Sequence, residues 1–505
     1  MKFLTIILIT VLIISLIETY IILSKEKTAM KIVKEMGFGY NLGNSFDCYD
    51  FNTKIKNPDE QITLLDNPIP TKKLINNIKK YGFKTIRLPV TWIYFIDDFG
   101  NINVEWMSRV KQVVKWIVEK NIYCILNLYH DGDSGNWLSD KNNAKNKYIN
   151  IWTQIAEEFK EYNEYLIFES MNKPLYLSNF NYEYDSLLFY TQSFVDTIRN
   201  SEGYNKKRLL IISGMSADIH ITCTIKYKMP KDPINKLAIS IQYFNPYEFT
   251  SMESNEYESY LSVDKWGKEA DYKELIDNFI SLKDFYIDKG IPVIITEVGV
   301  LTEENKEIDS IREYLYALFS LSNEYEGVMS CLWDTSNKNK GKMNYYNRET
   351  DEWYDKKIQD NFYKISNGNY VKSYDYNYIR NVETTTITGE FGDCPINLGE
   401  RKVLKIIINI SYVGKFLEDY FFEIFCYNRN GWYFDVDFGR RNGKKQYDGT
   451  IIYTIDISHQ NCYNYIEFYK WYGEFNFNNI TIEYKESFVS FDYKAYKSAI
   501  LNEIN

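Results

Sequence analysis

The chain has 505 residues, more than one ordinary domain holds, so two or three domains are expected. Hydrophobic residues make up 45% and charged residues 25%, a composition that supports packed cores and excludes wholesale disorder. The formal net charge is −10 and no block is rich in Lys and Arg, which argues against a nucleic-acid partner. Only three histidines occur, which speaks against a histidine-based metal cluster, and we expect neither a metal nor another cofactor.

The N-terminus has the arrangement of a secretory signal, because Lys2 precedes a 15-residue apolar run over residues 3–17. Glu18 interrupts this run, and no A-x-A cleavage site follows it. A cleaved signal peptide and an uncleaved signal anchor in the membrane therefore both stay open for residues 1–24. Either alternative places the rest of the chain outside the cytosol, so we expect an extracellular or cell-surface protein.

Between residues 36 and 365, eight short apolar runs alternate with amphipathic helical patterns, such as Leu74, Ile75 and Ile78 at the i, i+1 and i+4 positions of one stripe. Nearly continuous apolar runs are typical of parallel strands covered on both faces. Eight β/α units predict a closed (β/α)8 TIM barrel over residues 30–364; an open doubly wound sheet is less favoured, because no Gly-rich dinucleotide loop is present. The expected strands are 38–44, 85–90, 123–129, 165–171, 208–213, 238–244, 292–298 and 329–334, and the expected helices include 71–81, 104–120, 148–162, 186–200, 272–289 and 308–322.

Polar residues stand at the carboxyl end of every one of these strands, for example Asn44, Arg87 and Glu297. In a (β/α)8 barrel these ends surround the active site. The sequence therefore predicts a functional site at the C-terminal face of the barrel.

After residue 365 the pattern changes to short β-type runs. A polar linker is expected over residues 365–380, and the runs predict a β-sandwich over residues 381–487. Trp432, Tyr433, Trp471 and Tyr472 are candidates for stacking on sugars or for filling the sandwich core, so this domain is a candidate carbohydrate-binding domain. Residues 488–505 are expected to form a weakly helical, peripheral tail. The expected strands are 384–387, 403–410, 420–427, 432–438, 450–457, 465–469 and 479–484.

Five motifs, in order along residues 30–360, resemble those of glycoside hydrolase family 5, closest to its endo-β-1,4-glucanase and xyloglucanase branch. They are GYNLGN at 39–44, IRLPVTW at 86–92, LIFESMNKP at 166–174, YFNPYEFT at 243–250 and PVIITEVG at 292–299. The resemblance implies a retaining glycosidase, in which a glutamate at the end of strand 4 is the acid/base and one at the end of strand 7 the nucleophile, about 5–5.5 Å apart. It also implies β-glucan or a related plant-type polysaccharide as the partner.

The acid/base position departs from the family's Asn-Glu-Pro motif, because this chain has Lys173 there, whereas the nucleophile position is kept as Glu297. Gln242 and Tyr129 also replace family histidines. A lysine with a pKa near 10.4 is a poor general acid, and opposite a carboxylate its charged form is favoured further. We therefore expect Lys173 to form an ion pair with Glu297 and to impair catalysis.

The function expected from this pattern is that of a secreted cellulase-like barrel that binds β-glucan but hydrolyses it poorly. One alternative is an active retaining endo-β-1,4-glucanase that uses another acid, such as Asp131 or Glu248; another is a cell-surface interaction protein that no longer binds sugar. The residues expected to contact substrate are Asn44, Arg87, Trp92, Tyr129, His130, Trp137, Asn172, Gln242, Tyr243 and Trp333.

Overall fold

The computed structural model describes most of the barrel region and the strands and final helix of the C-terminal region. Residues 1–26, which include the predicted signal, and Trp137 and Trp432 lie outside the described residues. The described ranges are 27–50, 52–131, 144–174, 180–223, 227–252, 262–302, 306–336, 342–373 and 492–504, together with strands between residues 381 and 486.

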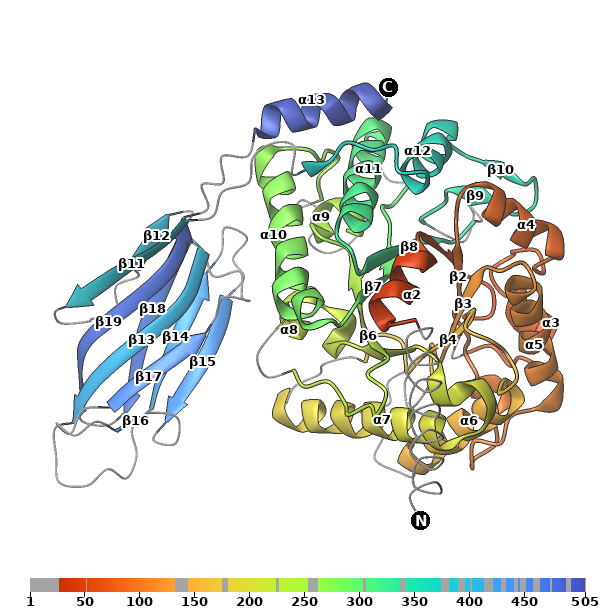
Figure 1. The fold of residues 1–505 in the computed structure, drawn as a ribbon, viewed down its shortest axis with the longest axis horizontal. Helices are drawn as coiled ribbons and strands as arrows, with labels where there is room; N and C mark the ends of the chain where they lie inside the picture. The colour runs from red at the N-terminus through yellow and green to blue at the C-terminus, as the bar shows by residue number, and fades with distance from the viewer. Residues whose placement is uncertain are drawn as a thin grey trace, which may run out of the picture.

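Eight parallel strands close into one barrel, with each strand paired to the next and β8 paired to β1 (Figure 1). The predicted barrel and all eight predicted strands are thus confirmed. Gly39 lies where a Cβ atom would come 2.2 Å from the Cys331 sulfur, so only glycine fits this part of the interior. The strands are β1 (Gly39–Leu42), β2 (Thr85–Leu88), β3 (Tyr123–Asn127), β4 (Leu166–Glu169), β5 (Leu210–Ser213), β6 (Leu237–Tyr243), β7 (Val293–Val298) and β8 (Val328–Asp334).

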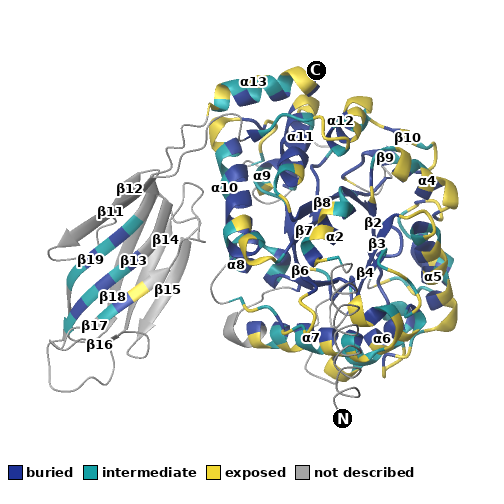
Figure 2. Ribbon diagram, in the orientation of Figure 1, coloured by how far each residue is buried: buried dark blue, intermediate teal, exposed yellow. Residues whose placement is uncertain are grey.

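The helices surround the barrel and bury their apolar stripes against it (Figure 2). Side-chain caps fix several starts: Thr71 accepts a hydrogen bond from the Leu74 amide, and Asn103 accepts from the Glu105 and Trp106 amides. All six expected helices are present, with ends shifted by a few residues. The α-helices are α2 (Ala29–Met36), α3 (Pro58–Ile62), α4 (Lys72–Lys80), α5 (Val104–Val118), α6 (Ala144–Glu158), α7 (Phe180–Asn200), α8 (Ile219–Thr222), α9 (Tyr247–Thr250), α10 (Glu269–Phe285), α11 (Ile308–Glu324) and α12 (Lys356–Ser366).

Short elements occupy several of the connections between strands and helices. The 3-10 turns are η1 (Ile93–Phe95), η4 (Gly203–Lys207), η5 (Met215–Ala217) and η7 (Ile287–Lys289), and a hairpin after β8 is formed by β9 (Tyr346–Asn347) and β10 (Glu352–Trp353).

Helix α2, which the sequence did not predict, closes one end of the barrel. Its Ile32, Val33 and Met36 belong to one buried cluster with strand residues such as Ile125 and Ile294. This cluster fills the barrel at the amino ends of the strands, so the opposite, carboxyl end is the one that remains to hold a site.

Two antiparallel sheets follow the barrel, one of five strands and one of four. Ile406, Ile408 and Ile410 alternate with less buried residues along β13, which gives the five-stranded sheet a buried face of its own. All seven predicted strands are present, and the sequence missed β12 and β16. The strands are β11 (Asn381–Thr388), β12 (Ile396–Gly399), β13 (Lys402–Tyr412), β14 (Phe421–Tyr427), β15 (Tyr433–Gly439), β16 (Lys444–Lys445), β17 (Ile451–Asp456), β18 (Asn464–Tyr472) and β19 (Phe475–Glu486).

After these sheets the chain returns to the barrel as helix α13 (Tyr493–Ile504), which lies beside α11 and α12 (Figure 1). Tyr496 and Ile500 are fully buried, and Tyr493 and Lys497 donate hydrogen bonds of 2.7 and 2.5 Å to the Gly267 carbonyl. The tail is therefore helical, as expected, but it is an integral part of the barrel's outer layer, whereas a peripheral position was expected.

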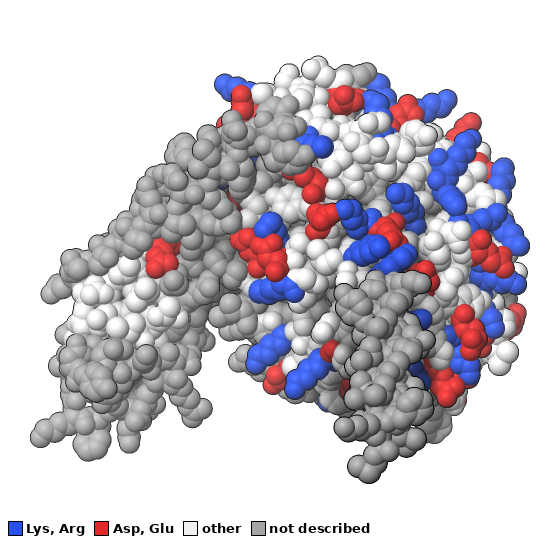
Figure 3. All heavy atoms as spheres, viewed as in Figure 1, with Lys and Arg blue, Asp and Glu red and all other residues white. Residues whose placement is uncertain are grey.

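The surface of the barrel carries interspersed acidic and basic side chains on the face shown in Figure 3. Exposed ion pairs of the barrel include Lys265 with Glu307 and Lys283 with Asp288. Within the described part of the chain, no helix is both long and apolar enough to cross a bilayer.

Candidate active site

Glu297 lies on β7 at a bulge. In the pairing with β6, Ile295 faces Ile241 and Glu297 faces Gln242, so Thr296 is an extra residue, and the pairing with β8 shifts over the same stretch. A bulge turns the side chains beside it to new directions and is common next to active sites. The Asn41 side chain donates a 2.8 Å hydrogen bond to the Thr296 carbonyl, which holds the bulged backbone in place.

Arg87, at the end of β2, is the centre of a buried polar cluster. Its Nη1 donates to Oε1 of Glu297 at 2.8 Å, and its Nε and Nη2 donate to the two oxygens of Glu169 at 2.7 and 3.0 Å. Arg87 is completely buried; although burial opposes its charge, the carboxylates of Glu169 and Glu297 outweigh this and raise its pKa. The guanidinium is therefore a permanent cation that orients Glu297.

Glu297 is nearly buried, and its two oxygens have different surroundings. Oε1 accepts from Arg87 and from the Tyr129 hydroxyl, at 3.0 Å. Burial raises the pKa of Glu297, and the hydrogen bonds from Arg87 and Tyr129 act in the opposite direction. Oε2 accepts no hydrogen bond from the described residues. Several polar atoms of those residues are fully buried and lack a partner, and Oε2 is not one of them.

Lys173 is exposed to solvent at the end of β4 and has φ of +24°. The expected ion pair between Lys173 and Glu297 is wrong: among the described residues the cation that pairs with Glu297 is Arg87, at 2.8 Å. Sequence reasoning missed this because it did not anticipate that Arg87 is completely buried. A buried cation needs an anionic partner close by, whereas an exposed ammonium is stabilised by water.

Asn172 and Gln242 are joined to the same cluster. The Gln242 amide donates to Oδ1 of Asn172 at 3.1 Å, and Arg87 Nη2 donates to the same oxygen at 2.9 Å. The predicted residues Arg87, Tyr129, Asn172, Gln242 and Glu297 are therefore brought together by the fold.

An aromatic surface and a pocket adjoin this cluster. The rings of Tyr129 and Trp333 are parallel, with centroids 5.9 Å apart, and His130 meets Tyr129 edge-on at 4.6 Å. Burial lowers the pKa of His130 to about 4, so its imidazole is neutral at neutral pH. Trp333 and Asn44 line a pocket of about 310 Å³. Its remaining lining residues are Leu65, Phe244, Leu301, Thr335, Lys342 and Met343.

Trp92 and Tyr243, which were expected to contact substrate, are buried and are not among the residues that line this pocket. Trp92 is 0% exposed, and its indole N–H donates to the Asn127 carbonyl. Tyr243 is 1% exposed and accepts a hydrogen bond from Asn278 of α10, outside the barrel. Because side chains alternate along a strand, the pocket residue is the neighbouring Phe244, which strand periodicity would have indicated.

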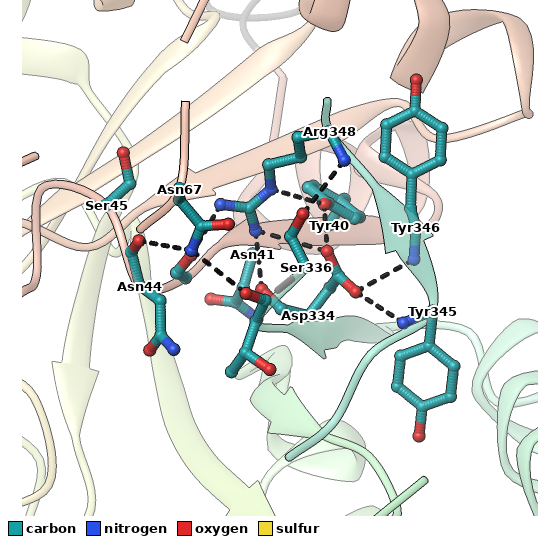
Figure 4. Close-up of polar contacts among 12 residues, drawn as sticks. Tyr40, Asn41, Asn44, Ser45, Asn67, Asp334, Ser336, Tyr345, Tyr346 and Arg348 are labelled. Carbon is teal, nitrogen blue, oxygen red and sulfur yellow. Dashed lines mark hydrogen bonds and ion pairs between the residues drawn. The ribbon is translucent and has the colours of Figure 1, made fainter. Parts of the chain in front are cut away.

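A second buried network joins the segment after β1 that carries Asn44 to Asp334 at the end of β8 (Figure 4). Arg348 donates to the Tyr40 hydroxyl at 3.1 Å, to the Gly43 carbonyl at 2.7 Å and to Oδ2 of Asp334 at 3.3 Å. Asn67 bridges the carbonyls of Asn44 and Thr335 at 2.9 and 3.1 Å. No sequence motif indicated Arg348 or Asn67, because both lie in connections outside the family motifs.

Glu169 and the two alternative acids that the sequence suggested, Asp131 and Glu248, have different surroundings. Both oxygens of Glu169 accept hydrogen bonds from Arg87, and its side chain is 1% exposed. Asp131 is 0% exposed, accepts from the Trp92 and Ile93 amides, and has its pKa raised to about 7 by burial. Glu248 lies on α9 and is half-buried.

A barrel of this topology with a buried glutamate beside an arginine at the carboxyl ends of its strands is the framework of a glycoside hydrolase. The cellulase model, glycosyl hydrolase family 5, matches residues 43–339, and the chain belongs to this family.

Endoglucanase A of Clostridium longisporum is 33% identical over 350 residues, covering 66% of this chain and 65% of the relative, so this chain spans just under two thirds of that protein. A solved GH5-4 broad specificity endoglucanase from an uncultured bovine rumen ciliate is 51% identical, with a TM-score of 0.65, covering 68% of this chain and 99% of that one. Another, from Ruminococcus champanellensis with bound cellotriose, is 28% identical, with a TM-score of 0.60 and coverage of 67% and 99%.

Proposed function

We propose that this chain is an extracellular barrel that binds β-glucan and is strongly impaired in hydrolysing it, because Lys173 stands at the acid/base position. The proposal rests on the contrast between the nucleophile position, Glu297, and the acid/base position, Lys173. Glu297 is held by Arg87 and Tyr129 as a nucleophile would be, whereas the side chain at position 173 is an exposed ammonium. Hydrolysis of a glycosidic bond needs a proton for the departing sugar oxygen, and general acid–base help is typically worth about 10²–10⁴-fold.

Binding of glucan is supported by the pocket that Trp333 lines, since aromatic faces pack on sugar rings. The solved relative that holds cellotriose has the same barrel. The apolar residues 3–17 support an extracellular or cell-surface location.

The test compares reducing-sugar release from mixed-linkage β-glucan by the native chain and its Lys173→Glu and Lys173→Gln variants. Because only Glu restores a proton donor, we expect little release by the native chain and by Lys173→Gln, and an increase of about 10²-fold or less by Lys173→Glu, since Gln242 and Tyr129 also differ from the family. Calorimetric titration with cellotetraose measures binding separately.

Rapid glucan hydrolysis by the native chain would overturn the proposed impairment and favour the active glucanase with a different acid. Failure of the native chain to bind cellotetraose would overturn the proposed binding and favour the interaction protein.

A further inference from the structure

We propose that Thr250 and Lys306 are positioning residues for glucan, because they join the connections that follow β6 and β7 into one wall of the pocket. Neither residue is among those that line the pocket, whereas Phe244 and Leu301 are. Thr250 and Lys306 therefore act through these two lining residues. This inference rests on the proposed function, since it concerns the pocket assigned there to glucan.

Thr250, the last residue of α9, connects the two lining residues directly. Its hydroxyl donates to the Phe244 carbonyl at 2.6 Å and, over a longer 3.1 Å, to the Pro246 carbonyl. Its own carbonyl lies at the helix end, where helix carbonyls lack a partner within the helix, and it accepts from the Leu301 amide at 2.9 Å. Thr250 is 0% exposed, so these hydrogen bonds are shielded from water. One residue therefore fixes the backbone of both lining residues.

Lys306, in the connection between β7 and α11, forms a second link to the connection between β6 and α10. Its ammonium donates to the Glu248 carbonyl at 2.9 Å. It also donates to the Ser262 hydroxyl and to the Val263 carbonyl, at 2.8 Å each. An ammonium group has three N–H donors, so these three acceptors match their number. Lys306 thus holds two parts of the β6–α10 connection against its own connection.

The acceptors of Lys306 are themselves held in place by backbone hydrogen bonds. The Val263 amide donates to the Glu248 carbonyl at 3.1 Å, and the Glu307 amide donates to the Asp264 carbonyl at 2.9 Å. The ammonium therefore meets an ordered set of oxygens on the neighbouring connection.

A fixed wall increases affinity because a loop that must become ordered on binding reduces it. The wall that presents Phe244 and Leu301 lines the same pocket as Trp333. If Thr250 or Lys306 loses its link, the atoms that line the pocket remain but their backbone is held less firmly. Glucan binding should then weaken although no lining residue has changed.

The first test measures the Kd for cellotetraose by calorimetric titration of the native chain and two variants. Thr250→Val removes the hydroxyl and nearly keeps the shape, whereas Thr250→Ser keeps the hydroxyl. We expect the Kd to increase about 3–10-fold in Thr250→Val, and by less than about 2-fold in Thr250→Ser.

The matched control is Thr191→Val in α7. The Thr191 hydroxyl is also buried and donates to a carbonyl, that of Leu187, at 2.8 Å, but Thr191 does not line the pocket. Thr191→Val should lower the thermal unfolding midpoint as Thr250→Val does and leave the Kd unchanged. This control separates a role in positioning from a general loss of stability.

Lys306→Met keeps most of the side-chain length and removes the three donors, and it should also raise the Kd about 3–10-fold. Its matched control is Lys265→Met. Lys265 lies on the same connection as Val263 and forms an exposed 2.7 Å ion pair with Glu307, which contributes little in water. Lys265→Met should leave the Kd unchanged.

A second measurement tests the wall without any sugar. Hydrogen exchange followed by mass spectrometry reports on the peptide that contains the Leu301 amide, which donates to the Thr250 carbonyl. Exchange of this peptide should become about 5-fold faster or more in Thr250→Val and Lys306→Met, and should not change in Thr191→Val.

The possible contrary results point to different steps. A native chain that does not bind cellotetraose overturns the proposed function together with this inference. If the native chain binds and Thr250→Val and Lys306→Met bind equally tightly, the positioning role is wrong and the proposed function stands. An equal rise in Kd for Thr250→Val and Thr191→Val has the same meaning. Unchanged exchange at Leu301 in both variants would show that the two connections are not joined in solution.

Discussion

At the scale of single residues, Glu297 and Tyr129 show how substitution has changed the site while keeping it ordered. The Tyr129 hydroxyl donates to Oε1 of Glu297, and its ring lies parallel to Trp333. The donated hydrogen bond stabilises the ionised carboxylate and opposes the effect of burial, which raises the pKa of Glu297. The Tyr129 hydroxyl therefore lowers the pH at which the Glu297 carboxyl group ionises.

The Tyr129→Phe variant keeps the ring and removes only that hydroxyl. The ionisation of Glu297 can be followed in both proteins by the pH dependence of its carboxyl carbon NMR signal. Its midpoint should lie above the ordinary glutamate value of about 4.3 in the native chain, because burial raises the pKa. Loss of a hydrogen bond to a charged group, worth about 1.5–3 kcal/mol, should move the midpoint of the variant up by about one pH unit or more.

The matched control is Tyr49→Phe, which removes a hydroxyl from a neighbouring ring that is stacked on His130 with the centroids 5.7 Å apart. An unchanged midpoint in Tyr129→Phe, or an equal change in both variants, would show that the hydrogen bond from Tyr129 does not control the ionisation of Glu297.

At the scale of elements, helix α13 is the segment whose importance the sequence understated. Its Tyr493 and Tyr496 rings contact Tyr272 of α10, with centroids 5.6 Å away in each case, and Lys497 forms a 3.3 Å ion pair with Glu313 of α11. These contacts come from a helix that follows both C-terminal sheets in the chain. The sequence of residues 488–505 indicated a weakly helical tail, but only the fold shows which surface the helix covers.

The Ile500→Ala variant tests whether α13 stabilises the barrel. Ile500 is fully buried, so truncation should lower the free energy of unfolding of the barrel by about 2–4 kcal/mol, measured by urea denaturation followed by tryptophan fluorescence. Asn502→Ala, in the same helix but exposed, should change it by no more than about 0.5 kcal/mol. Equal small effects of the two substitutions would show that α13 is not docked in solution.

At the scale of the whole molecule, the barrel and the C-terminal sheets have separate cores. The barrel's buried cluster includes Tyr496, Ile500 and Ile504 of α13, whereas the buried residues of the five-stranded sheet lie outside it. Those sheet residues are Ile406, Ile408, Ile410, Tyr453, Ile480 and Ile482. Units with their own cores unfold independently when few contacts join them.

Differential scanning calorimetry of the full chain should therefore show two unfolding transitions. Ile500→Ala should lower the midpoint of the barrel transition only, because α13 packs on the barrel although it follows the sheets in the chain. Ile408→Ala, in the buried face of β13, is the matched variant and should lower the other transition only. A single transition that both variants shift equally would show that the two units unfold together.

The sequence by itself determined the barrel, because eight apolar runs and the apolar helix stripes between them can be buried together in few ways. It also determined that Arg87, Asn172 and Glu297 meet, because the carboxyl ends of parallel strands surround one opening. The tertiary structure alone decided which side chains face that opening. The bulge at Thr296 turns Glu297 toward Arg87, strand alternation buries Tyr243 and presents Phe244, and Trp92 lies inside the core. It also decided that Arg87, and not Lys173, neutralises Glu297, because a buried charge requires a partner that an exposed one finds in water.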